Sequence, residues 1–145
     1  MPGAPIPWPV SARWRAPGRL FLAVMVLAAL AAVADERWIL VEGGSWAPDA
    51  ALVGQLRERI GPAVTAQARA AGRELRPWAT YTFQYQGQEV GGRRFVFVNA
   101  FCVHDEARDL RRQMVLVSDG GTCFFSVRYD PASGGFSGLL IHGEA

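Results

Sequence analysis

The chain has 145 residues, half of them hydrophobic, and its 15 basic and 13 acidic residues give a formal net charge of +2. Every basic residue is an arginine, and three of them, Arg13, Arg15 and Arg19, lie in the first 34 residues. Residues 35–145 therefore carry 12 basic and 13 acidic residues, a net charge of −1, with no basic stripe. This balance argues against nucleic acid as a partner, because binding to phosphates needs a concentrated positive surface.

Residues 1–34 are predicted to be a cleaved secretory signal peptide. The three arginines precede an uncharged apolar run at 20–33, and residues 32–34 form a small-x-small pattern, so cleavage is expected between Ala34 and Asp35. The apolar run is shorter than the roughly 20 residues that a membrane-spanning helix needs. We therefore expect a periplasmic or secreted protein that contacts the membrane only if the signal stays uncleaved.

Residues 35–145 are long enough for a single globular domain. Its only cysteines, Cys102 and Cys123, are expected to form a disulfide, because an even and minimal number of cysteines in an exported chain favours a bridge. Such a bridge closes a loop of about 20 residues and stabilises the fold by about 3 kcal/mol. Two buried free thiols are the alternative.

The first part of this domain is predicted to be helical. Residues 38–41 form a short apolar run, which is either an edge strand or an extended segment. A helix is then expected to begin near Pro48 and Asp49 and to end at Gly72. A proline inside it predicts a kink or break at Gly61-Pro62. The apolar residues of its buried face recur every four residues: Leu52, Leu56, Ile60 and Val64.

After Trp78 the apolar pattern changes to a period of two, which indicates strands. The expected strands are residues 78–86, 94–102, 114–117, 122–129 and 136–142. The expected turns are 87–92, a tight hairpin at 119–121, and 130–135. The run at 94–102 is apolar on both faces, as in a central strand. The fold class is therefore α+β, with an N-terminal helix on a curled antiparallel sheet of about four to five strands.

This strand order conflicts with the disulfide. In a simple meander, Cys102 and Cys123 would lie at opposite ends of the sheet, about 20 Å apart, whereas a disulfide needs Cα atoms within about 7 Å. One solution makes residues 104–112 a short helical crossover, so that the strand ending at Cys102 pairs with the strand starting at Cys123. A register slip with a long bulged loop is the other solution.

No residue pattern in the chain identifies a catalytic, metal or cofactor site. His104, Asp105, Glu106 and Asp109 cluster after the first cysteine, but one histidine among acids lacks the spacing of a committed zinc site. Neighbouring arginines favour a solvated charged turn instead. His142 has no nucleophile that the sequence pairs with it, so a surface histidine is the preferred interpretation. We predict no catalytic residue, no metal ligand and no cofactor.

Large aromatic residues are the most informative binding signal. Their strand periodicity favours packing in a core against the helix, and the alternative is a concave aromatic surface for an apolar ligand. The residues concerned are Trp38, Trp46, Trp78, Tyr81, Phe83, Phe95, Phe97, Phe124 and Phe125.

The C-terminal half carries a resemblance. Residues 119–139 read DGGTCFFSVRYDPASGGFSGL, the chain ends in HGEA, and residues 97–102 read FVNAFC. Together they resemble small exported bacterial proteins of uncharacterised function, mainly over residues 78–145. The order of one helix and then a sheet is also similar in architecture to the cystatin-like superfold, without the inhibitor signature QxVxG. The resemblance implies export and brings no established activity or site residues.

Two functions are compatible with these observations. The first is a non-catalytic exported domain that binds a protein partner or a small apolar ligand through a sheet face or an edge. The alternative is a small enzyme whose α+β pocket pairs an acid, Asp105 or Glu89, with a histidine.

Overall fold

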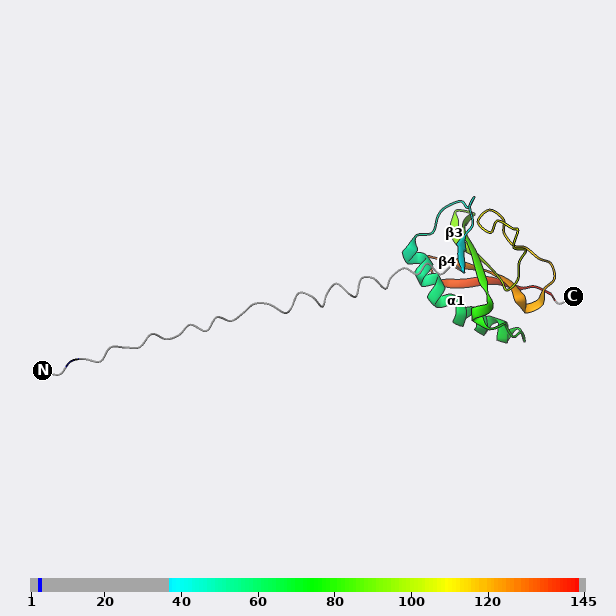
Figure 1. The fold of residues 1–145 in the computed structure, drawn as a ribbon, viewed down its shortest axis with the longest axis horizontal. Coiled ribbons are helices and arrows are strands. Elements are labelled where there is room, and N and C mark those ends of the chain that lie inside the picture. Colours follow the sequence, from blue (N-terminus) through cyan, green and yellow to red (C-terminus); the bar gives the residue numbers. More distant parts are fainter. Residues whose placement is uncertain (1–2, 4–36, 144–145) are drawn as a thin grey trace. The chain divides into compact units, whose positions relative to one another are not determined.

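The structure, a computed structural model, describes Gly3 and residues 37–143, so the predicted signal and its cleavage point at Ala34 and Asp35 lie outside the described residues. One helix packs against a five-stranded sheet (Figure 1), which confirms the α+β class. The elements are β1 (Trp38–Leu40), α1 (Ala50–Ala70), β2 (Thr82–Val90), β3 (Arg93–Phe101), β4 (Phe124–Asp130) and β5 (Gly135–Ile141), with 3-10 turns at Trp78–Thr80 and Gly121–Cys123. No helix in the part of the chain described has both the length and the apolarity to span a bilayer.

The strands lie side by side in chain order, from β1 to β5. β2 to β5 form an antiparallel meander, but β1 pairs in parallel with β2, with Trp38 opposite Phe83. The sheet is therefore mixed, and the prediction of an antiparallel sheet is wrong for this edge strand. The reason is that α1 separates β1 from β2 and returns the chain to the same end of the sheet, as parallel neighbours require.

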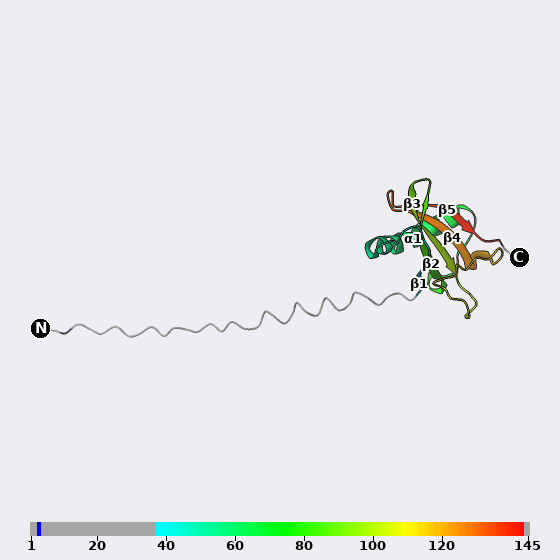
Figure 2. The same cartoon turned by 90° about the horizontal axis from the view of Figure 1, so that it is seen from above.

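α1 lies across one face of the sheet (Figures 1 and 2). Its buried residues are Leu56, Ile60, Val64 and Ala68, whereas Leu52, the first residue of the predicted stripe, is only partly buried. The helix continues through Pro62, so the predicted break is absent, and a kink there stays a prediction. Proline inside a helix costs about 3 kcal/mol. The buried residues Ile60 and Val64, on either side of Pro62, offset this cost by packing into one core.

Both ends of α1 are closed by local contacts. Asp49 is the N-cap, because its Oδ1 accepts a hydrogen bond from the backbone N–H of Leu52 at 2.8 Å. Pro48 therefore lies before the cap, and the prediction that it occupies the first helical position is wrong. Gly72 follows the last turn with a φ of +71°. Its N–H and that of the next residue donate back to the last turn in the Schellman pattern, which glycine favours.

The sheet face beneath α1 carries an almost wholly apolar core. Phe83, Ala100 and Phe125 lie opposite one another across β2, β3 and β4, and Trp38 stacks on Phe83 with ring centroids 4.4 Å apart. The hydroxyl of Tyr129 is buried here without a hydrogen-bond partner among the described residues. The buried residues of this core are Leu56, Ile60, Val64, Tyr81, Phe83, Val96, Val98, Ala100, Phe125, Val127 and Tyr129.

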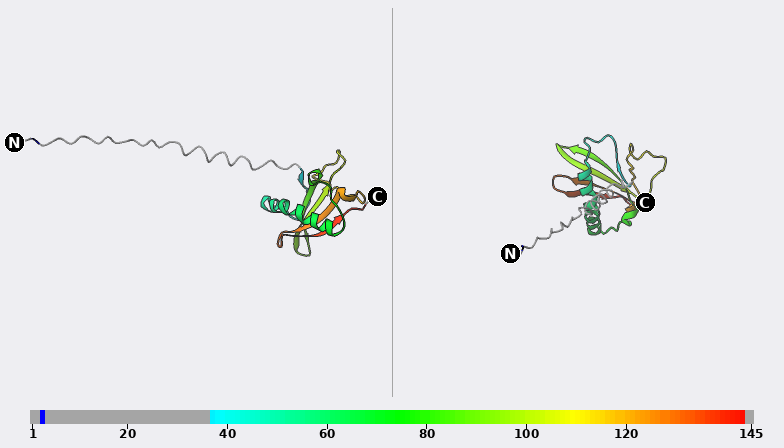
Figure 3. Two further views of the ribbon diagram at one scale, coloured as in Figure 1. Left: turned by 90° about the horizontal axis from the view of Figure 1, so that it is seen from below. Right: turned by 60° about the vertical axis from the view of Figure 1, so that its left-hand side comes forward.

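The opposite face of the sheet is partly covered by residues 103–118, which we call the cover loop (Figure 3, right). Beneath it, Gln84 of β2 and Asn99 of β3 lie opposite each other and are fully buried. Gln84 Nε2 donates to two loop carbonyls at 2.7 and 2.8 Å, and its Oε1 accepts from Val115 N at 2.7 Å. Asn99 Nδ2 donates to Val115 O at 2.7 Å and to Gln84 Oε1 at 3.3 Å. Two strand amides therefore supply the bonds that this irregular backbone lacks.

A disulfide closes the base of the cover loop. Cys102 and Cys123 are bonded, with Cα atoms 5.2 Å apart, which confirms the predicted pairing. Their proximity follows from the direct antiparallel pairing of β3 and β4, in which Phe101 lies opposite Phe124. The strand predicted at 114–117 is wrong, because this run belongs to the loop. The loop contains no helical crossover either, so the conflict between the meander and the bridge disappears.

Of the three predicted turns, 130–135 is confirmed and 119–121 is wrong. The turn predicted at 87–92 is confirmed only in its last two residues, because residues 87–90 belong to β2. Gly91 and Gly92, with φ values of +59° and +75°, form the two-residue turn between β2 and β3. Residues 131–134 connect β4 to β5. The tight hairpin predicted at 119–121 is wrong, because residues 114–117 are not a strand and the segment leads from the cover loop into β4.

β5 is the last strand of the sheet, and its seven residues carry no charge. Gly138, with a φ of +64°, lies at a register shift between β4 and β5. Two helix-side residues reach this strand: Gln67 Nε2 donates to Phe136 O at 3.5 Å, and Arg73 Nη2 donates to His142 O at 3.2 Å. The edge is therefore bulged, and α1 partly covers it.

Candidate functional site

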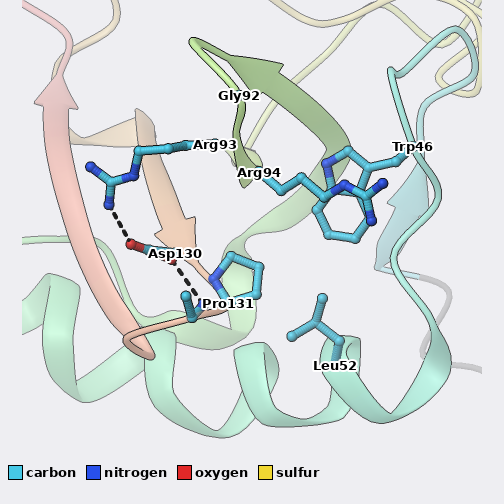
Figure 4. A pocket seen from close by; sticks show the side chains of 8 residues that line it. Trp46, Leu52, Gly92, Arg93, Arg94, Asp130 and Pro131 are labelled. Carbon is cyan, nitrogen blue, oxygen red and sulfur yellow. Dashed lines mark hydrogen bonds and ion pairs between the residues drawn. The ribbon is translucent and has the colours of Figure 1, made fainter.

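A pocket of about 430 Å³ opens where the β2–β3 hairpin turns. We call it the hairpin pocket. Four segments distant in sequence meet there: the loop before α1, the first turn of α1, the hairpin, and the β4–β5 turn (Figure 4). Its size suits a small molecule, since such sites measure about 300–1,000 Å³. The lining residues are Trp46, Leu52, Gly92, Arg93, Arg94, Asp130, Pro131 and Ala132.

Trp46 forms one wall and is seated on the hairpin by a glycine. A Cβ on Gly87 would lie 2.9 Å from the indole ring, so only glycine permits this approach. Trp46 Nε1 donates to Gln88 O at 3.1 Å, and Ser45 N donates to Gly87 O at 2.8 Å. The indole is therefore fixed before any ligand arrives, with its polar N–H already bonded.

Arg94 lies over the indole of Trp46, with its guanidinium carbon 5.6 Å from the ring centroid. The hairpin register places Glu89 opposite Arg94, and Arg94 Nε lies 3.5 Å from Glu89 Oε2. Both side chains are well exposed, so the ion pair contributes at most about 1 kcal/mol, and the cation–π contact contributes about 0.5–1 kcal/mol. Arg94 is therefore oriented, but it is not locked.

The other arginine of the hairpin serves a different purpose. Figure 4 shows Arg93 turned away from Arg94 and toward Asp130. Arg93 Nη2 donates to Asp130 Oδ2 at 2.9 Å, and Ala132 N donates to Asp130 Oδ1, also at 2.9 Å. These contacts, with the Ala132 N–H as the largest cause, lower the pKa of Asp130 below its ordinary value. The carboxylate fixes the β4–β5 turn that forms the far wall.

The lining combines apolar side chains with two arginines and one aspartate. The lining residues include no histidine, cysteine, serine, threonine or lysine. Asp130 is the one lining carboxylate, and its lowered pKa is the opposite of the raised value that a general acid needs near neutral pH. The pocket offers apolar walls, the guanidinium of Arg94 beside Trp46, and an Asp130 carboxylate that is already hydrogen-bonded to Arg93 and to the backbone of Ala132.

The acids considered for catalysis lie apart from each other. Glu89 lies at the hairpin, whereas Asp105 is exposed in the cover loop, where its Oδ1 accepts a hydrogen bond from Ala107 N at 3.0 Å. Asp109 makes a similar turn contact with Arg111 N at 3.1 Å. Residues 37–143 contain no group of three or more histidine, cysteine or acidic side chains placed to hold a metal ion.

The two histidines lie at the end of the sheet opposite the hairpin. The His104 ring lies edge-on to Phe101, with centroids 5.4 Å apart, and the His142 ring lies edge-on to Phe124 at 6.4 Å. Phe101 and Phe124 are themselves cross-strand partners. The histidines therefore flank an aromatic pair and are separated from Glu89 by the length of β3.

The sequence signals for the site were incomplete. The aromatic pattern of the sequence includes Trp46 in a possible ligand surface. It does not predict a site role for Arg93, Arg94 or Asp130. The available signal was the pair of arginines directly after a Gly-Gly turn, which a hairpin must project at its tip.

Comparisons with known proteins identify no relative of this chain. A scan of protein-family models, a search of curated proteins and a search of solved structures each return no match to this chain. The resemblance to small exported bacterial proteins and the similarity to the cystatin-like superfold therefore stay predictions.

Proposed function

We propose that this chain is an exported, non-catalytic binding domain whose hairpin pocket takes a small ligand with an apolar body. The observation that carries the proposal is the seating of Trp46 on Gly87, which presents a fixed aromatic wall to an open pocket. Leu52 and Pro131 add apolar surface from α1 and the β4–β5 turn. Small-molecule sites are typically such preformed, mostly apolar hollows with few polar groups.

Export is the second part of the proposal. The signal-like segment at 1–34 motivates it, and the disulfide between Cys102 and Cys123 is compatible with an oxidising compartment. Intact mass of the protein recovered from the periplasm or medium tests it. We expect a chain that begins at Asp35 and takes up two alkyl groups only after reduction. A full-length chain with both thiols alkylated directly would contradict export.

Binding is tested with N-phenyl-1-naphthylamine, a neutral apolar fluorophore. We expect saturable binding that quenches tryptophan emission. Ala132→Trp places a bulky ring in the pocket from an exposed turn position, and it should abolish the quenching. Ala107→Trp adds the same ring in the cover loop and is the matched control, which should bind as the unmodified protein does. Equal binding by the Ala132→Trp variant would place the dye elsewhere and contradict the proposed site. Absence of saturable binding both by this dye and by the acids and amides named below would refute it.

A further inference from the structure

We infer that the ligand of the hairpin pocket is an organic anion, with its apolar body against Trp46 and its carboxylate on Arg94. This inference rests on the proposed function and specifies its ligand class. It follows from three properties of the charged groups in and beside the pocket: Arg94, Asp130 with its partner Arg93, and Glu89.

The first property is the position of Arg94 over the aromatic wall. A purely apolar ligand that covers Trp46 also covers the guanidinium above the ring and removes water from it. Desolvating a charged group without a new hydrogen bond is costly. A carboxylate on the same ligand replaces the lost water with charge-assisted hydrogen bonds. The pocket therefore favours an acid over an uncharged analogue of the same shape.

The second property is the side of the guanidinium that Glu89 occupies. Glu89 contacts Arg94 through Nε. Among the described residues, no other acidic side chain pairs with Arg94, so its two Nη groups are available as a fork. The guanidinium fork matches the two oxygens of a carboxylate and binds them with two parallel hydrogen bonds.

The third property is that Asp130 is already satisfied. Its two oxygens accept hydrogen bonds from Arg93 and from the backbone of Ala132, so it does not present a free carboxylate to a ligand ammonium group. The cation of the pocket is thus oriented and accessible, while its anion is neutralised. This asymmetry argues against amines and zwitterions and in favour of monocarboxylates.

Glu89 then acts as an internal competitor for the guanidinium. A ligand carboxylate at Arg94 adds a second negative charge beside Glu89, and the two carboxylates repel each other. Removing the charge of Glu89 should therefore tighten acid binding, whereas removing the charge of Arg94 should weaken it. A merely structural role for this exposed ion pair would not give opposite changes in affinity.

The experiment is calorimetric titration with three acids of different bodies, 3-phenylpropionate, 2-naphthylacetate and octanoate, each beside its primary amide. At low ionic strength we expect at least one acid to bind about tenfold or more tightly than its amide, as one charge-assisted contact allows. Arg94→Gln should remove this preference, and Glu89→Gln should increase it. Arg57→Gln is the matched control, because Arg57 lies over Trp38 at 5.8 Å, outside the pocket. The preference should also shrink as salt is raised, since Arg94 is exposed.

The outcomes distinguish failure of the anion inference from failure of the proposed function. Acid preference that depends on Arg94 and not on Arg57 supports both. Equal binding of acid and amide, blocked by Ala132→Trp, overturns the anion inference and keeps the proposed function. Acid preference that persists in Arg94→Gln places the anion elsewhere and overturns the inference. Failure of all six probes and of N-phenyl-1-naphthylamine overturns both.

Discussion

The two faces of the sheet are covered by different physical means. On one face, α1 buries a periodic stripe of apolar side chains, and Gln67 adds one side-chain hydrogen bond to Phe136 O of β5. On the other, the cover loop has no regular hydrogen bonding of its own, and Gln84 and Asn99 bond its backbone from the strands. A disulfide and a small apolar cluster complete that side. Buried amide side chains in a strand can therefore indicate that an irregular segment covers that face of the sheet.

The largest expected loss of stability comes from a substitution in the core beneath α1. Phe83 is fully buried and contacts the rings of both Trp38 and Trp78. Phe83→Ala should lower the free energy of unfolding by about 3–5 kcal/mol, through lost transfer energy and the cavity left behind. Urea unfolding followed by circular dichroism measures this loss, with Phe83→Leu as a milder variant that keeps the protein folded. Val90→Ala, at an exposed strand end, should change it by less than about 0.5 kcal/mol. Similar losses at the two positions would show that this face is not the principal core.

The next effect belongs to the disulfide of the loop-covered face. The double substitution of Cys102 and Cys123 by serine should cost about 3 kcal/mol, because it frees a segment that spans 21 residues in the unfolded chain. Hydrogen exchange should accelerate in the cover loop and remain slow in α1. Equal acceleration in both regions would mean that the two covers do not open separately.

A smaller loss is expected at Gln84. Gln84→Leu keeps the volume but leaves the carbonyls of Leu110 and Gln113 and the N–H of Val115 without their partner. The free energy of unfolding should fall by about 2 kcal/mol. The loss is not larger because the loop can move away from the sheet, where water bonds its backbone groups. Faster exchange of the Val115 N–H, together with chemical unfolding, checks this expectation. Gln88→Leu, on the same face of the same strand but only partly buried, is the control and should be nearly neutral.

At Tyr129, in contrast to the positions above, we expect a substitution to raise the free energy of unfolding. Its hydroxyl is buried beneath α1 without a partner among the described residues, so Tyr129→Phe should stabilise the fold by about 1 kcal/mol. Tyr81 lies in the same core, but its hydroxyl donates to Thr122 O and accepts from Arg76 N at 3.1 Å. Tyr81→Phe should therefore destabilise by about 1 kcal/mol. Thermal unfolding of the two variants in parallel tests the contrast, and a shift in the same direction for both would refute it.

The smallest effect lies at the hairpin pocket, at the end of the sheet opposite the two histidines. Asp130 has a lowered pKa in the folded protein, so its ionised form contributes stability that is present above the ordinary value of 3.8 and is lost as the pH falls through the folded value. The advantage of the unmodified protein over Asp130→Asn should therefore disappear in acid. Chemical unfolding of both proteins from neutral pH downward measures it, and a constant difference at all pH values would contradict the assignment.

The fold was predictable where side-chain period decides the structure. The four-residue spacing through Leu56, Ile60 and Val64 and the alternation in β2 each predicted the correct element. The apolar run at 114–117 was predicted as a strand because its composition suits one. Val115 is indeed buried there, but amide side chains of the sheet hold its backbone, and no neighbouring strand does. A local apolar pattern predicts that a segment is buried. It does not predict whether a neighbouring strand or a side chain bonds the backbone of that segment.

The candidate site was predictable only in its aromatic part. Trp46 stood out by its size, whereas the contact between Arg93 and Asp130 spans 37 positions and depends on the pairing of β3 with β4. The parallel pairing of β1 was missed for the same reason, because strand direction follows from the path of α1 across the sheet. Contacts of this kind are properties of the assembled sheet.

The bulged edge of β5 has a consequence for self-association. A free edge of uncharged residues such as GFSGLLI is a template onto which a second chain can add in the manner of an amyloid seed. This chain has no lysine to deter such growth. Instead, the left-handed glycine at Gly138 interrupts the ladder, and Gln67 and Arg73 occupy carbonyls at or just beyond either end of the strand. We therefore expect Gly138, Gln67 and Arg73 to limit the addition of a second chain at this edge.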